Sequence, residues 1–114
     1  MIKEYIEEIH EYLQSELYWD AEFHSYSPNE NKLVIRISTD FTYYHNLEIT
    51  FLDVVHFRLT KEWRVDLPAL FTSAESFDIN GTQFFIFTLS SDDEEQSIAA
   101  RTFTFSKEIV KYYK

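Results

Sequence analysis

The spacing of apolar residues changes once in this chain, at Trp19, and this change limits the possible folds more than any other feature. Before Trp19, apolar residues recur every three or four positions, which is the period of an amphipathic helix. They are Ile2, Tyr5, Ile6, Ile9, Tyr12, Leu13 and Leu17. From Trp19 onward, apolar and polar residues alternate, as in a half-buried strand. The pattern therefore predicts one helix over residues 2–17, followed by strands.

The first strands are predicted on either side of a turn. Two alternating runs flank the segment Ser-Pro-Asn-Glu-Asn at residues 27–31, which predicts an antiparallel hairpin. A third strand begins at Leu47, and Asp53 falls on its apolar phase. Because a carboxylate is not stable unpaired in a core, we expect a bulge or bend at Asp53.

Asn80-Gly81 is the strongest turn signal in the chain. Both central residues of a type I′ turn need a positive φ, which Asn-Gly supplies, so the pair predicts a hairpin in which Phe77 faces Phe84. The following run, residues 83–89, is apolar on both phases and predicts a strand covered on both faces.

The last part of the chain predicts one more strand and a short helix. The sixth strand covers residues 98–105, and Ser106 can cap a terminal helix. The apolar side of that helix would be formed by Ile109, Val110 and Tyr113. The fold class expected for the single domain 1–114 is α+β. It comprises an N-terminal amphipathic helix packed on a mostly antiparallel sheet of about six strands, with a short C-terminal helix.

The charge of the chain indicates which partners to expect. Twenty acidic and ten basic side chains give a net charge of −10. Nucleic acids and anionic membranes attract Lys and Arg, so we expect neither as a partner. A basic protein would be attracted, although a charge of this size also serves solubility alone. The charged N-terminus and the lack of long apolar runs lead us to expect a cytoplasmic protein.

Few catalytic signatures are possible in this composition. The chain has no cysteine, which excludes thiol catalysis, and a single glycine, which excludes phosphate-binding glycine loops. Its four histidines form no pair at metal-binding spacing along a helix. We therefore expect no cofactor and no metal, and the oligomeric state stays open.

Two groups of residues are candidates for a site. For partner binding they are the aromatic pair at a predicted strand connection and an acidic run, namely Tyr43, Tyr44, Asp92, Asp93, Glu94 and Glu95. The alternatives are partial burial for the tyrosines and a solvated loop for the acids. For a pocket or its rim, the candidates are Trp19, Asp20, His24 and Asp53.

One stretch of the sequence resembles a known group of proteins. An aspartate and a small residue open a hairpin, an alternating strand follows, and a later strand carries aliphatic-x-Phe-x-x-Val. The matching positions are Asp20, Ala21, Leu33, Ile35, Ile37, Ile49, Phe51 and Val54. This pattern is similar to that of small bacterial proteins, some of them placed among immunity proteins of polymorphic-toxin systems. Where the pattern often has a histidine before the aspartate, this chain has Trp19.

Three functions are compatible with these observations. The acidity, the missing catalytic signatures, the cytoplasmic character and the resemblance together favour a non-enzymatic, acidic protein-binding module. The resemblance implies an immunity protein, which would neutralise a basic bacterial toxin by occlusion. The alternatives are a small enzyme or ligand-binding domain with a pocket between helix and sheet, and a structural or assembly subunit. A sealed core with an acidic outer face favours binding, whereas a deep pocket containing His24 or Asp53 favours chemistry.

Overall fold

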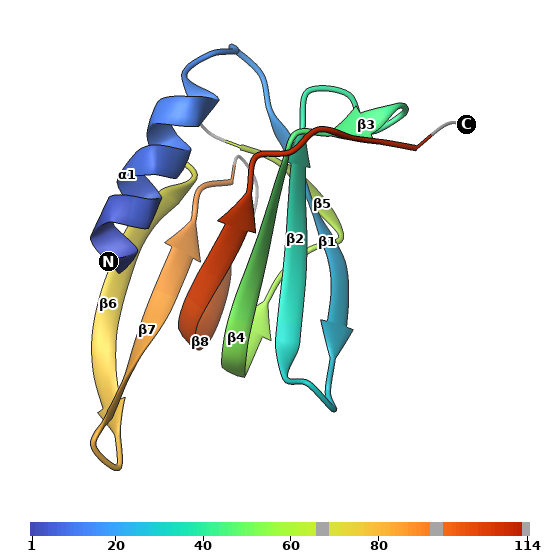
Figure 1. Ribbon diagram of the computed structural model, residues 1–114. Helices are drawn as coiled ribbons and strands as arrows, with labels where there is room; N and C mark the ends of the chain where they lie inside the picture. Colours follow the sequence, from blue (N-terminus) through green and yellow to red (C-terminus); the bar gives the residue numbers. More distant parts are fainter. Residues whose placement is uncertain (66–68, 92–94, 113–114) are drawn as a thin grey trace.

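A computed structural model describes residues 1–65, 69–91 and 95–112 (Figure 1). The chain begins with one helix, α1 (Ile2–Leu13). The described strands are β1 (Asp20–Ser27), β2 (Lys32–Ser38), β3 (Tyr44–His45), β4 (Leu47–Arg58), β5 (Glu62–Arg64), β6 (Phe71–Ile79), β7 (Thr82–Leu89), β8 (Gln96–Ser106) and β9 (Val110–Lys111).

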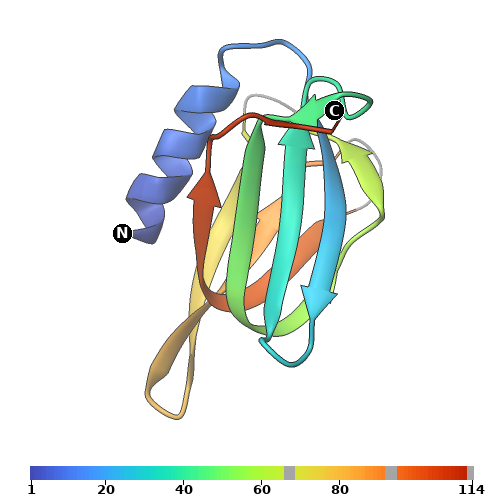
Figure 2. The same cartoon turned by 45° about the vertical axis from the view of Figure 1, so that its right-hand side comes forward.

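Seven of these strands form one antiparallel sheet in the order β5-β1-β2-β4-β8-β7-β6. The sheet curls until its two halves face each other, and α1 lies beside β8 (Figures 1 and 2). This arrangement confirms the α+β class and the first predicted hairpin, which β1 and β2 form. The sheet has seven strands instead of about six.

The predicted C-terminal helix is wrong. After Ser106 the chain stays extended, and β9 pairs with β3 as a separate two-stranded sheet. A helix nucleus is costly to form, and the few residues left after Ser106 offer little length to offset that cost. Ile109 and Val110 are also β-branched, which favours the extended conformation. Tyr113 lies outside the described residues.

The helix also ends earlier than predicted. The backbone N–H groups of Gln14 and Ser15 bond to carbonyls three residues back, which tightens the last turn. The Leu13 carbonyl accepts a hydrogen bond from Trp19 Nε1 at 2.7 Å instead of continuing the helix. Leu17 is consequently 80% exposed, and its predicted place on the buried stripe is wrong.

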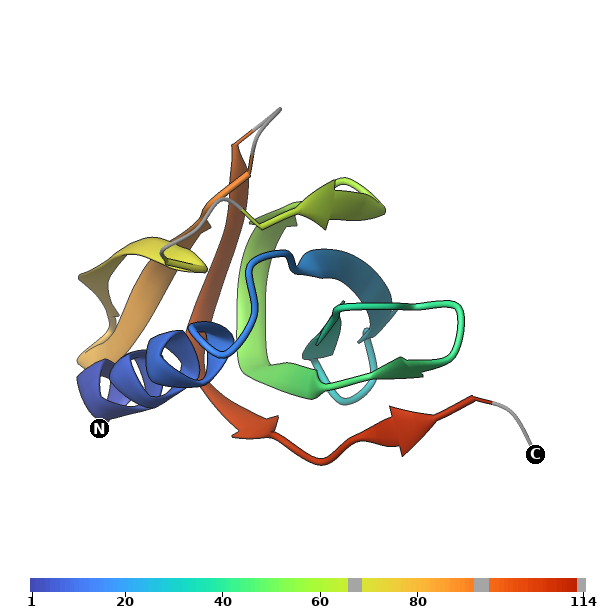
Figure 3. The same cartoon turned by 90° about the horizontal axis from the view of Figure 1, so that it is seen from above.

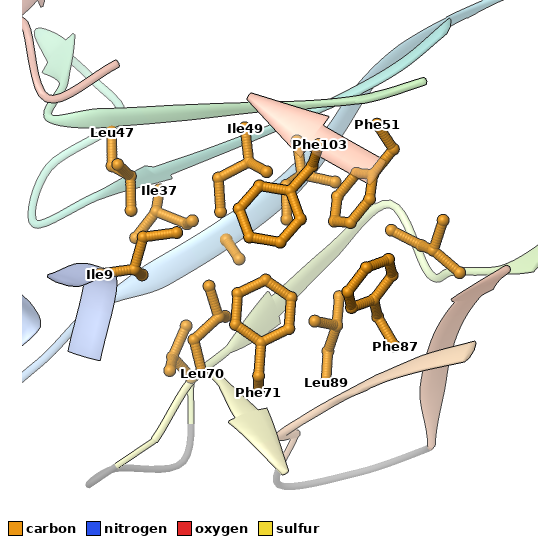
Figure 4. Packing of buried hydrophobic residues seen from close by; sticks show 14 of the residues in the cluster. Ile9, Ile37, Leu47, Ile49, Phe51, Leu70, Phe71, Phe87, Leu89 and Phe103 are labelled. Carbon is orange, nitrogen blue, oxygen red and sulfur yellow. The ribbon is translucent and has the colours of Figure 1, made fainter. Parts of the chain in front are cut away.

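Side chains from both halves of the sheet meet in the core (Figure 4). Phe71 from one half stacks on Phe103 from the other, with ring centroids 5.5 Å apart. Ile9 and Leu13 of α1 are fully buried in the same cluster. The helix therefore closes the core beside the sheet.

The backbone of β4 bends at Asp53. Phe51 pairs with Phe103, and three positions further along β4, Val54 pairs with Ala100. Residues three positions apart on a regular strand face opposite sides of the sheet, yet all four of these residues are buried. Asp53 adopts a φ of 54° between these pairs. Its carboxylate points outward and binds Arg101, with Oδ2 and Nε 2.5 Å apart. The predicted bend is confirmed, and it removes the carboxylate from the core.

The Asn80-Gly81 turn is confirmed as well. Asn80 has a φ of 48° and Gly81 a φ of 85°, and Phe77 pairs with Phe84 across the hairpin. The expectation that β7 is covered on both faces is wrong, because Ile86 on its outer face is 43% exposed. The inner face alone packs on the core.

Candidate binding surface

Exposed apolar side chains gather at the end of the sheet where β1 begins and β2 ends. We call this region the loop end, comprising residues 14–20, 39–46, 62–64 and 107–112 (Figure 3). Ten large hydrophobic residues are exposed in the described parts of the chain, and the loop end contains six of them. These six are Leu17, Tyr18, Tyr43, Ile109, Val110 and Tyr112. A concentration of exposed apolar groups of this kind is typical of an interaction site.

A hollow of about 420 Å³ opens within the loop end. We call it the rim pocket, and it is lined by Asp20, Thr39, Asp40, Phe41, Thr42, Glu62, Trp63 and Arg64. Its residues come from the start of β1, the β2–β3 connection and β5. The lining contains three carboxylates and one guanidinium group.

The single cation of the rim pocket is already engaged. Arg64 Nε lies 3.5 Å from Asp20 Oδ1, and the Arg64 guanidinium lies 5.5 Å from the centre of the Tyr18 ring. Within the described ranges, neither Asp40 nor Glu62 forms an ion pair. Asp40 Oδ1 instead accepts the Thr42 N–H at 3.0 Å. The pocket therefore carries two more carboxylates than cations, which favours a positively charged ligand.

The two predicted tyrosine anchors differ in their surroundings. Tyr43 is 54% exposed. Tyr44 is half-buried, and its hydroxyl lies 2.8 Å from Thr39 Oγ1. Tyr43 is thus the more exposed of the two, while Tyr44 is bonded to the loop that carries both.

A polar cluster around the buried His45 holds the C-terminal segment against the loop end. His45 Nδ1 lies 2.8 Å from the Tyr112 hydroxyl, and His45 Nε2 lies 3.4 Å from Glu48 Oε2 without a hydrogen bond. Glu48 Oε2 also accepts a hydrogen bond from Arg36 Nε at 3.2 Å. A second tie is the Tyr112 N–H, which donates to the Tyr43 carbonyl at 2.9 Å. These bonds fasten the backbone beneath Tyr43.

Burial shifts the pKa values of two groups in this cluster, His45 and Tyr112. It lowers the pKa of His45 below its ordinary value, Arg36 lowers that pKa further, and Glu48 opposes both effects. Burial also raises the pKa of the Tyr112 hydroxyl. The neutral imidazole and neutral phenol are the forms that this environment favours. Sequence reasoning missed the cluster because His45 and Tyr112 are 67 positions apart with no shared motif.

The other predicted site residues are scattered. Of the four pocket candidates, only Asp20 lines the rim pocket. Trp19 is buried in the core, His24 is exposed at a bulge in β1, and Asp53 lies at the bend of β4. Glu95 is exposed, whereas Asp92, Asp93 and Glu94 lie outside the described residues.

A second and larger hollow lies between α1 and the sheet. The pairing of β7 with β8 ends at Phe85 and Ala100, and beyond that point Tyr5 of α1 packs on Phe103 and Phe105 of β8. The resulting groove has a volume of about 850 Å³. Its lining is formed by Met1, Ile2, Lys3, Ile6, Glu7, Ala74, Thr82, Gln83, Phe85, Arg101 and Thr102. We call it the helix groove; neither His24 nor Asp53 contributes to its lining.

The described part of the chain shows neither a metal site nor a membrane-spanning helix. The described residues contain no group of three or more His, Asp or Glu side chains placed to hold a metal ion. Among these residues, no helix is long and apolar enough to cross a membrane. Comparison with protein families, with curated proteins and with solved structures found no match to this chain.

Proposed function

We propose that this chain is a non-enzymatic binding module that engages a basic protein through the loop end. The observation that carries the proposal is that exposed apolar side chains and surplus carboxylates occur together at the loop end. Six of the ten exposed large hydrophobic residues of the described chain lie in the loop end, which also holds a pocket with surplus carboxylates. Buried aromatic anchors supply most of the affinity of an interface, and complementary charge supplies the rate of encounter.

Each part of the loop end has a role in this mechanism. The net charge of −10 attracts a basic partner from a distance. The rim pocket accepts a Lys or Arg side chain beside Asp40 and Glu62, and the rings of Tyr18 and Tyr43 cover the apolar surface around it. Because hydrogen bonds already fix the backbone at Tyr43, little conformational entropy is lost on binding.

The resemblance to immunity proteins extends the proposal to the identity of the partner. In this extension the chain occludes the active surface of a basic bacterial toxin. Most of the matching positions, such as Leu33, Ile35 and Phe51, are buried core residues, so they support the fold. Asp20 is the matching residue that also lines the rim pocket.

The test is a kinetic comparison of variants with the protein encoded beside this gene, expressed as an inactive toxin variant. Glu62→Gln should lower the association rate, with Glu30→Gln in the β1–β2 turn as the matched control. Tyr43→Ala should raise the dissociation rate roughly tenfold or more, since anchors govern dissociation. Unchanged kinetics in both loop-end variants, or no binding at all, would contradict the proposal.

The helix groove supports a second candidate function, the binding of a small apolar ligand. Its volume of about 850 Å³ lies within the range of ligand pockets, and Ile2, Ile6 and Phe85 give it an apolar lining. An apolar fluorescent probe, anilinonaphthalene sulfonate, should then bind saturably to the folded protein. Ile6→Gln should abolish that binding, and Leu17→Gln at the exposed loop end should leave it unchanged.

A further inference from the structure

Strand β6 leaves one edge of the sheet without a partner. It is the terminal strand of the seven-stranded sheet and pairs only with β7. At its start, the Phe71 N–H donates to His10 Nε2 at 3.1 Å, so the edge is closed there by α1. From Ser73 to Ile79, no other strand of the described chain pairs with it.

The hairpin turn determines which backbone groups this edge presents. In a two-residue hairpin the residues flanking the turn, here Ile79 and Thr82, exchange hydrogen bonds with each other. Hydrogen-bonded and non-bonded positions then alternate along the strand. Ala74, Ser76 and Asp78 therefore direct their N–H and C=O groups toward the open edge.

Two features that commonly block strand addition, proline and a bulge, are absent along this stretch. Ser73–Ile79 contains no proline or lysine, and the irregularity in β6 lies before it, between Phe71 and Ser73. The hairpin of β6 and β7 also projects beyond the other strands (Figures 1 and 2). An open edge of this kind is a template for an additional strand.

The charge of the hairpin selects the strand that it would accept. Residues 71–89 contain Glu75 and Asp78 but no Lys, Arg or His. The outer face is apolar beside Glu75, where the Phe77 and Phe84 rings lie 5.8 Å apart and Ile86 is exposed. Glu75 and Phe77 lie two residues apart on the same face of β6. An added strand would therefore place a basic side chain near Glu75 and, two positions along, an apolar side chain on Phe77.

We propose that the open edge of β6 binds an extended, basic segment of a partner protein by strand addition. This surface is separate from the loop end, so the proposal goes beyond the function proposed above. A second copy of this chain is the less suitable occupant. It would bring another Glu75 and Asp78 to the same ribbon, and each copy carries a net charge of −10.

The test uses an acetylated and amidated peptide with the repeat Lys-Thr-Val-Thr as the probe, in which lysine and valine share one face of the strand. On binding, hydrogen exchange at the amides of Ala74, Ser76 and Asp78 should slow at least severalfold. Ser76→Pro removes one edge N–H without breaking a bond to β7 and should abolish binding, while Ser76→Ala should retain it. Glu75→Gln should weaken binding severalfold, and Glu62→Gln in the rim pocket should have no effect.

Three outcomes would overturn the proposal. They are the absence of saturable binding, exchange that is not slowed at the three amides, and binding that survives Ser76→Pro. Dimerisation of the free protein that is lost in Ser76→Pro would assign the edge to a second copy instead. If Ser76→Pro does not fold, two N-methylated versions of the probe peptide are used with the unchanged protein instead. One is methylated at the odd-numbered backbone nitrogens and the other at the even-numbered ones. Only the peptide whose methyl groups replace the N–H groups that face β6 should then fail to bind.

Discussion

The end of helix α1 can be tested by a matched pair of substitutions at Leu13 and Leu17. Both residues belong to the same apolar stripe in the sequence, yet Leu13 is fully buried and Leu17 is 80% exposed. Leu13→Ala removes buried methyl groups and leaves a cavity, which should lower the free energy of unfolding by about 2–5 kcal/mol. Leu17→Ala should change it by less than about 0.5 kcal/mol.

Both effects are measurable in one assay. A domain of this size is stable by about 5–15 kcal/mol, so Leu13→Ala should still fold. A loss of about 3 kcal/mol corresponds to a fall in Tm of roughly 12 °C. Urea titration can follow the fluorescence of Trp19 and Trp63, both of which are buried. A similar loss in the two variants would show that the helix continues to Leu17, and the account of its end would be wrong.

Three further predictions concern turns, charge and pH. Gly81→Val places a β-branched residue at a φ of 85° and should cost about 1–2 kcal/mol in a urea titration, with Gly81→Asn costing less. Asp53→Asn and Arg101→Gln should show a coupling below about 1 kcal/mol in a double-mutant cycle, because the pair is about half exposed. Burial lowers the pKa values of His10 and His45, so the unfolded chain binds protons more readily than the folded chain. Stability should therefore fall as pH drops from about 7.5 to about 5.5, by at most about 1.4 kcal/mol per pH unit for each histidine. The slope should be smaller in His45→Gln.

The parts of the fold that depend on local chemistry could be predicted from the sequence. Asn80-Gly81 adopts the positive φ values that these residue types favour, and the chain bends at Asp53, whose carboxylate lies outside the core. The parts that depend on distant partners could not. The helix ends where Trp19 bonds the Leu13 carbonyl, and the C-terminal segment is extended because it pairs with β3.

In the candidate site too, the residues that local sequence indicates could be predicted, and those that distant strand pairing brings in could not. Tyr43 and Asp20 could be identified as exposed or rim residues from their positions next to predicted strands. Glu62 joins them only because β5 pairs with β1, a contact between segments about 40 positions apart that no local pattern indicates. Tyr18 had a usable signal, since a ring next to the inward-facing Trp19 has to point away from the core.

The most direct test of the central claim is a hydrogen-exchange footprint of the complex with the basic partner. If the partner binds at the loop end, hydrogen exchange of the backbone amides should slow over residues 39–44 and 62–64. Exchange in the β1–β2 turn at residues 27–31 should not change. The slowing should be lost together with binding when Tyr43→Ala and Glu62→Gln are combined. Slower exchange confined to other parts of the chain, with residues 39–44 and 62–64 unchanged, would contradict the claim.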